Sequence, residues 1–247
     1  MRIAGLTTVR NEEFLIGSTI AHLLDQGIDH IYAQDDSSTD STFEILESFG
    51  SHVTVSHVHA PHHLQAQWMN HLAELAHREG FEYIVPFDAD EWWFGAGGCT
   101  VREAIERSSA DVLRARLLRH WSWDYRDAAA DPHDKVAYRY RPGVSLVQGN
   151  HGVDTPAGWC LEETGALEIR EWKYRSADHF VAKIRSGAAR TDPAAPLEVN
   201  RHYRDFAHLT DAEVRAVYEG TDKEETFDPI PSRFRPDREG ADHGAEA

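Results

Sequence analysis

The stretch Tyr83-Ile84-Val85-Pro86-Phe87-Asp88-Ala89-Asp90-Glu91 decides the fold of this 247-residue chain. Its first four residues predict a buried strand, and three carboxylates follow within four residues, where that strand ends. Two like charges about 4 Å apart repel by roughly 4 kcal/mol at an effective dielectric of about 20. A hard divalent cation relieves that repulsion, because Mg²⁺ and Mn²⁺ prefer oxygen ligands. In a continuous strand Asp88 and Asp90 would point to the same side, since side chains alternate along it.

A solvated acidic turn without a metal is the alternative interpretation of the same stretch. The residues that follow it, Trp92-Trp93-Phe94, argue against this alternative, because an ordinary surface turn seldom carries three aromatic side chains. We therefore begin from a ligand site at the end of the strand.

Upstream of this stretch, strands and helices alternate with short connections. Apolar runs and helical spacing of apolar residues predict strands over residues 2–9, 28–34, 53–58 and 83–87, and helices over 13–26, 41–49 and 64–78. This order is typical of an α/β domain with a mostly parallel central sheet flanked by helices.

The pattern downstream is less regular. It predicts helices over 101–107, 176–186 and 211–218, strands over 111–118, 144–148 and 167–172, and an irregular or hairpin insertion over 121–140. No linker divides the chain, so we expect a single domain over residues 1–227. The prolines and charges of residues 228–247 predict a disordered tail.

Composition excludes several classes of protein. The net charge of −17 argues against a general nucleic-acid binder and against attachment to an anionic membrane surface. Cys99 and Cys160 are too few for a disulfide framework or a four-cysteine zinc site, which favours a reducing, cytoplasmic setting. No signal peptide and no apolar run long enough for a transmembrane segment is present.

Three polar clusters follow the predicted parallel strands: Arg10-Asn11-Glu12, Asp35-Asp36 and Asp88-Ala89-Asp90. Ligands of such sheets bind beyond the carboxyl ends of the strands, so the three clusters are expected to meet at one edge. The first two clusters have a local alternative as a helix start or a capping cluster. The edge shared by all three clusters favours a binding site over separate local features.

In these segments the chain resembles family-2-type glycosyltransferases of the GT-A fold. The resemblance is carried by Thr8-Val9-Arg10-Asn11-Glu12-Glu13, Gln26-Gly27-Ile28-Asp29, Asp35-Asp36-Ser37-Ser38-Thr39-Asp40-Ser41 and Asp88-Ala89-Asp90-Glu91, in the expected order. Gly149-Asn150-His151 and Tyr174-Arg175-Ser176 are similar to a bacterial branch of the family. The chain departs from the family at Glu171-Trp172-Lys173, where a basic or aromatic residue is usual, and this affects the acceptor side.

The resemblance implies a GT-A-like single domain, with a nucleotide-sugar-binding half over 1–95 and an acceptor half over 96–227. It implies a nucleotide-diphospho-sugar donor, Mn²⁺ or Mg²⁺, and transfer with inversion to a hydroxyl of a glycan, lipid-linked or small-molecule acceptor. The substrate-binding residues it implies are Val9, Arg10, Asn11, Glu12, Asp35, Asp36, Asp88, Ala89, Trp92 and Arg175. The metal ligands it implies are Asp88, Asp90 and His151.

The general base is the least defined residue. Glu162, Glu163 and Asp154 lie in the irregular region where acceptor loops of this fold are found, and each is a candidate. Arg175 and Lys183 leave two interpretations open, a solvated position or a contact to the diphosphate.

Other functions use the same residue types. A sugar-nucleotide nucleotidyltransferase shares the sheet and the acids, but it usually carries a glycine-rich basic loop where Thr8-Val9-Arg10-Asn11-Glu12 stands. A non-catalytic carbohydrate-binding protein would suit the tryptophans but has no use for paired acids at one edge. A glycoside hydrolase needs two acids about 5–9 Å apart across a sugar bond, which adjacent acids do not provide.

Overall fold

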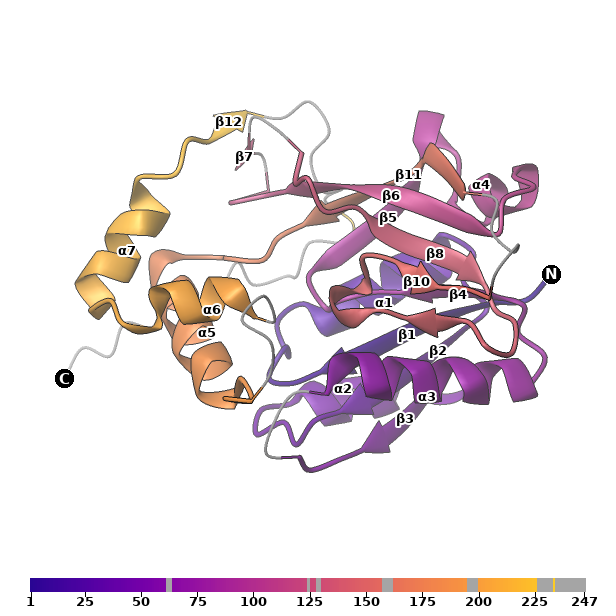
Figure 1. Cartoon of the computed structure of the whole chain (residues 1–247), viewed down its shortest axis with the longest axis horizontal. Helices are drawn as coiled ribbons and strands as arrows, with labels where there is room; N and C mark the ends of the chain where they lie inside the picture. The colour runs from indigo at the N-terminus through magenta and orange to yellow at the C-terminus, as the bar shows by residue number, and fades with distance from the viewer. Residues whose placement is uncertain are drawn as a thin grey trace.

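The computed structural model describes residues 1–60, 64–123, 125–127, 130–156, 162–194, 200–225 and 233 (Figure 1). Its centre is an eight-stranded sheet in the order β3-β2-β1-β4-β8-β6-β11-β5. The strands are β1 (Ile3–Val9), β2 (His30–Asp35), β3 (Val53–His57), β4 (Tyr83–Pro86), β5 (Glu91–Gly95), β6 (Val112–Arg119), β8 (Lys135–Arg139) and β11 (Glu162–Glu171).

The strands β3, β2, β1 and β4 run parallel, and β6 and β11 are parallel to each other. Strand β8 is antiparallel to both β4 and β6, so the carboxyl ends of β1, β2, β4, β6 and β11 share one edge. Strand β5 returns antiparallel to β11. The expected α/β class with a mostly parallel sheet is confirmed.

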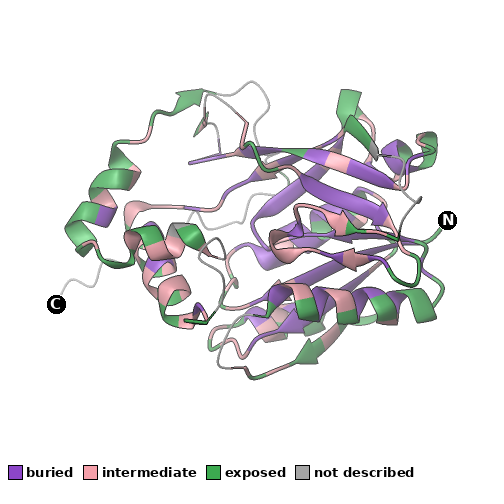
Figure 2. Cartoon of the chain, in the orientation of Figure 1, coloured by how far each residue is buried: buried purple, intermediate pink, exposed green. Residues whose placement is uncertain are grey.

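Helices cover both faces of the sheet. The helices are α1 (Ile16–Asp25), α2 (Thr42–Ser48), α3 (Gln65–Arg78), α4 (Val101–Arg107), α5 (Ala177–Arg190), α6 (Arg201–Ala207) and α7 (Asp211–Glu219). One core cluster joins α1, α2 and α4 to the sheet, and a second joins α3 to the other face. Alternation along β1 divides its side chains between them: Ile3 lies in the first cluster, Ala4 and Leu6 in the second. Figure 2 shows the resulting buried sheet.

Helices α5, α6 and α7 form a separate group beyond the carboxyl edge of β1, on the side of the molecule away from the N-terminus (Figure 1). Phe180 and Ile184 of α5 pack with Val214 of α7 and with Trp121 and Tyr174. The apolar face of α5 is therefore committed to its own helical neighbours, and its polar face is left for the sheet edge.

One expectation for the sheet is wrong, and a second is incomplete. The region 121–140 contains β8, which lies in the middle of the sheet, rather than only an irregular insertion or hairpin. The strand expected over 167–172 is longer, since β11 begins at Glu162. The aromatic run after Asp90 adds a further strand, β5. Short strands β7 (Tyr125–Arg126), β9 (Ser145–Leu146), β10 (Val153–Asp154) and β12 (Glu224–Glu225) complete the described chain.

None of the helices in the described ranges is both long and apolar enough to cross a membrane. The predicted tail, residues 228–247, lies outside the described residues except for Arg233.

Candidate active site

The three acids after β4 lie in a tight turn, not in a strand. The backbone N–H of Glu91 donates to the carbonyl of Asp88 at 3.1 Å, which closes a turn over residues 88–91. Alternation of side chains requires an extended backbone, so the expectation that Asp88 and Asp90 face the same side is wrong. Each of the two carboxylates instead contacts a different lysine.

Asp88 belongs to a cluster with Glu91 and Lys135. Lys135 Nζ, on β8, lies 2.8 Å from Asp88 Oδ2 and 2.8 Å from Glu91 Oε1. Gln65, the first residue of α3, donates from Nε2 to Asp88 Oδ1 at 3.2 Å. Burial by itself would lower the pKa of Lys135, but Asp88 and Glu91 outweigh it and raise that pKa above its ordinary value. Lys135 therefore stays charged inside the sheet.

Asp90 belongs to a second cluster, with Glu12 and Lys183. Lys183 Nζ, on α5, lies 2.7 Å from Asp90 Oδ2 and 3.3 Å from Glu12 Oε1. Burial would raise the pKa of Asp90, but Lys183 outweighs it and lowers that pKa to about 2. Arg175 NH1 lies 3.7 Å from Glu12 Oε2 and its guanidinium lies over the ring of Phe14. Two acids and two cations thus meet at the end of β1 and β4.

Asp35 and Asp36 end β2 and are both buried. His57 Nδ1 lies 2.9 Å from Asp35 Oδ2, and the N–H of Ser38 donates to the same oxygen at 3.1 Å. The other carboxylate oxygen of Asp35 has no hydrogen-bond partner among the described residues. A buried acceptor left unpaired costs about 1–3 kcal/mol, which a ligand N–H or O–H would recover.

Arg190, the last residue of α5, donates to Asp36 Oδ2 at 2.5 Å. Arg10 donates to the Asp36 carbonyl at 2.7 Å, and the Asp36 N–H donates to the carbonyl of Val9 at 2.8 Å. The backbone of Asp36 therefore joins the carboxyl ends of β1 and β2, because it is hydrogen-bonded to both Val9 and Arg10.

Asn11 joins the loop after β1 to the loop after β2. Its backbone is left-handed, with φ of 53°, its Oδ1 accepts the N–H of Thr39 at 2.8 Å, and its own N–H donates to Ser38 Oγ at 3.0 Å. The N–H of Glu12 donates to Thr42 Oγ1 at 2.8 Å. These bonds hold both loops in place, and direct ligand contacts of Asn11 stay a prediction.

The expected metal ligands are not assembled. His151 Nδ1 lies 3.0 Å from the carbonyl of Asp134, and Asp88 and Asp90 are each paired with a lysine. Within the described ranges no group of three His, Cys, Asp or Glu side chains is placed to hold a metal ion. A dication at Asp90 would meet the Lys183 ammonium, which is already 2.7 Å from the ligand oxygen. In this arrangement the residues do not fit Mn²⁺ or Mg²⁺.

Trp92 was expected to contact substrate, but its side chain is fully buried among Leu15, Trp123 and Trp172. A ring without exposed surface has no face to offer a sugar, so this expectation is wrong for the described conformation. Ala89 is also buried, and its carbonyl accepts from Thr19 Oγ1 at 2.6 Å. Both residues anchor the acidic turn to the core.

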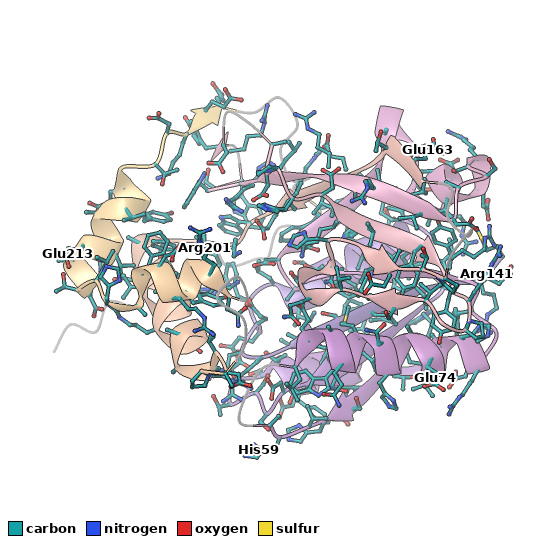
Figure 3. The ribbon with its side chains drawn as sticks, viewed as in Figure 1. His59, Glu74, Arg141, Glu163, Arg201 and Glu213 are labelled. Atoms are coloured by element: carbon teal, nitrogen blue, oxygen red, sulfur yellow. The ribbon has the colours of Figure 1, made fainter. Side chains whose placement is uncertain are left out.

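Two of the expected general bases, Glu162 and Glu163, lie on a part of β11 away from the acidic turn. Glu163 is at the start of β11, whereas the end of β11 reaches the site, because the N–H of Trp172 donates to the carbonyl of Asp90 at 2.9 Å. Figure 3 labels Glu163 near α4, far from Arg201 on α6. The backbone of Glu162 precedes it on the same strand, and its side chain lies outside the description. Asp154 is exposed on β10 and stays a prediction.

Sequence reasoning missed Lys135, Arg190 and Gln65. A signal existed for Arg190: it follows Lys183 by seven residues, which places both on one face of a helix. Lys135 gave no such signal, because a lysine at the start of a short apolar run is ordinarily a solvated strand end.

Residues 6–117 match the family model described as glycosyl transferase family 2. No curated protein sequence matches the chain. Solved structures that match include S. aureus TarS 1-349, at 15% identity and a TM-score of 0.48, covering 85% of this chain and 73% of that one.

Two further solved structures match the chain with lower TM-scores. TarS 1-349 in complex with UDP-GlcNAc matches at 14% identity and a TM-score of 0.47, covering 89% of this chain and 72% of that one. Glucosyl-3-phosphoglycerate synthase from Mycobacterium tuberculosis, in complex with Mn²⁺, UDP and glucosyl-3-phosphoglycerate, matches at 18% identity and a TM-score of 0.26, covering 36% of this chain and 34% of that one. Over residues 6–117 the chain therefore resembles glycosyl transferase family 2, and this similarity supports glycosyltransferase activity.

Proposed function

We propose that this protein transfers a sugar from a nucleotide-diphospho-sugar donor to an acceptor hydroxyl, with inversion at the anomeric carbon. The observation that carries the proposal is the row of buried acids at the carboxyl ends of β2 and β4, Asp35, Asp36 and Asp90, bounded by two cations from α5. The match of residues 6–117 to the glycosyl transferase family 2 model supports the same reaction class.

Asp35 and Asp36 suit the nucleoside part of the donor. A carboxylate accepts hydrogen bonds from a nucleobase N–H or from ribose hydroxyls, and one oxygen of Asp35 has no partner in the described part of the chain. Arg190 pairs with the Asp36 carboxylate at 2.5 Å, which fixes the position of that side chain. The base end of the donor is therefore proposed at the end of β2.

Asp90 and Glu12 then face the diphosphate end, together with Lys183 and Arg175. As the sugar–oxygen bond breaks, negative charge develops on the leaving diphosphate, and fixed cations stabilise it. Metal dependence, which the resemblance implies, is left out of this proposal because a lysine holds each acid of the turn. An acceptor hydroxyl attacking from the opposite face needs a base, and the proposal assigns none.

Binding is tested with a panel of nucleoside diphosphates: UDP, GDP, ADP, CDP and dTDP. We expect one of them to raise the melting temperature and to bind by calorimetry, and Asp36→Asn to weaken that binding by about tenfold, the effect of losing roughly 1.4 kcal/mol of interaction. Glu44→Gln, on the exposed face of α2, is the matched control and should bind as the wild type.

Activity is tested by donor breakdown with water as the acceptor. The matching diphospho-sugar should release its nucleoside diphosphate, and proton NMR of the first-formed sugar should show the anomer opposite to that of the donor. Retention of the donor anomer contradicts inversion. Release of pyrophosphate from a nucleoside triphosphate and a sugar phosphate would instead identify a nucleotidyltransferase.

A further inference from the structure

Helix α5 places two cations along the acidic edge. Lys183 contacts Asp90 and Glu12, and Arg190 contacts Asp36. Seven residues, two helical turns, separate these cations, so their Cα atoms lie about 10 Å apart along the helix axis. One face of α5 thus reaches both Asp36, proposed to bind the nucleoside, and Asp90, proposed to lie at the diphosphate.

Asp90 already has a cation beside it. Asp90 and Glu12 both contact the Lys183 ammonium, and Arg175 lies 3.7 Å from Glu12. Lys183 Nζ lies 2.7 Å from Asp90 Oδ2, so a metal ion ligated by this oxygen would have to displace the ammonium.

Lys183 also has bonding capacity left. An ammonium has three N–H donors. Two are directed at Asp90 (2.7 Å) and Glu12 (3.3 Å), and the third contact, to the carbonyl of Lys173, is long at 3.5 Å. The side chain keeps 19% of its surface exposed. The third N–H is thus the one that can turn to an incoming phosphate oxygen without losing a short bond.

We propose that Lys183 Nζ, and not a divalent cation, is the positive charge at Asp90 that binds the diphosphate of the donor. Asp90 and Glu12 hold the ammonium in place, and the third N–H donates to a phosphate oxygen. No covalent bond to Lys183 forms or breaks. This inference rests on the proposed function, since it assumes a diphosphate ligand.

The test uses the full chain and the nucleoside diphosphate that binds best in the panel above, with its nucleoside as a probe that lacks phosphate. Wild-type affinity for the diphosphate is expected to be the same in EDTA and in Mn²⁺. Lys183→Met, which keeps the aliphatic stem, is expected to lose at least tenfold in EDTA. Mn²⁺ should restore part of that loss, because Asp90 is then free to ligate a metal. Nucleoside affinity should change less than twofold.

Asp178→Asn is the matched control on the same helix, since Asp178 is exposed and pairs only with Arg215 among the ion pairs described. Its diphosphate affinity should equal that of the wild type. Wild-type binding that disappears in EDTA overturns the inference, and so does a Lys183→Met variant that binds as well as the wild type in EDTA. The first of these results needs no variant, so misfolding of Lys183→Met cannot hide it.

Failure of the inference and failure of the proposed function give different results. If the diphosphate binds but needs a metal, or ignores Lys183, only the inference falls. If neither nucleoside nor any nucleoside diphosphate binds the wild type, the proposed function falls and the inference falls with it.

Discussion

Lys135 and Lys183 neutralise neighbouring acids of the same turn but belong to different parts of the molecule. Lys135 lies on β8, in the middle of the sheet, with its side chain 5% exposed between Asp88 and Glu91. Lys183 lies on α5, whose apolar face packs on α7, and its side chain is 19% exposed beside Asp90. The first charge is enclosed by the sheet, and the second is brought to the sheet edge by a covering helix.

The difference separates a structural ion pair from one that can change partners. Removing one partner of a fully buried ion pair costs the most folding stability, because the remaining charge is then neither paired nor hydrated. A charge carried by a helix at a ligand-binding edge can exchange a protein contact for a ligand contact at little cost. We therefore expect the Lys135 cluster to govern folding and the Lys183 cluster to govern binding.

The strongest test of this comparison is Lys135→Met. Removing one partner of a buried pair costs about 3–5 kcal/mol, and here Glu91 would be left fully buried without its cation. Urea unfolding should show that loss, and Mn²⁺ should not restore it, since Glu91 is enclosed by the sheet. If Mn²⁺ restored the stability of Lys135→Met, the metal would be binding at Asp88 and Glu91, and the distinction from the Asp90 cluster would be wrong.

Low pH should decrease the free energy of unfolding through the protonation of His22. This buried histidine of α1 lies with Nε2 2.6 Å from the carbonyl of Trp93 on β5, and burial lowers its pKa from 6.5 to about 4. The unfolded state then binds more protons than the folded state between those two values. The contribution of His22 is complete above pH 6.5 and is lost as the pH falls towards 4, about 3 kcal/mol in all.

The measurement is the free energy of unfolding in urea at steps between pH 7 and pH 4. His22→Gln removes the titrating group, so the dependence on pH in this window should become shallower in that variant, whatever its absolute stability. An unchanged slope would mean that other groups cause the acid sensitivity.

Lys183→Met should cost less stability than Lys135→Met, about 1–2 kcal/mol, because truncation of the partly exposed lysine leaves Asp90 within reach of a proton or a cation. Unlike the loss at Lys135, this one should shrink when Mn²⁺ is added. Urea unfolding of the two variants, each with and without Mn²⁺, makes the comparison directly. Equal losses that both ignore Mn²⁺ would remove the distinction between the two lysines.

Sequence predicted the parts of this site that depend on local pattern. The apolar runs before Asp35 and Asp88 are strands, and the acids after them lie at one edge, because parallel strands with helical crossovers put their carboxyl ends together. The direction of each acid depended instead on a turn: the bond from the Glu91 N–H to the Asp88 carbonyl separates Asp88 from Asp90. A motif of alternating acids does not contain that information.

Strand β8 was missed for a related reason. Its first residue, Lys135, is charged, and a buried lysine is plausible only when its acidic partners are known to lie beside it. Those partners are about 45 residues away in sequence, and β4 and β6 bring them together only in the folded sheet. Tertiary pairing of this kind has no local pattern.

Glu163→Gln should have the smallest effect of all. The register against β6 places Glu163 opposite Leu113 and Glu171 opposite Arg119, so Glu163 lies roughly 20 Å along the sheet from the acidic turn, at about 3.3 Å per residue. Its exposed carboxylate accepts from Ser108 Oγ, a bond that glutamine can replace. Release of nucleoside diphosphate from the donor should change less than twofold, and stability by less than about 0.5 kcal/mol. A hundredfold loss of release at unchanged stability would make Glu163 the general base, and the reacting sugar would then lie at the opposite edge of the sheet from both lysines.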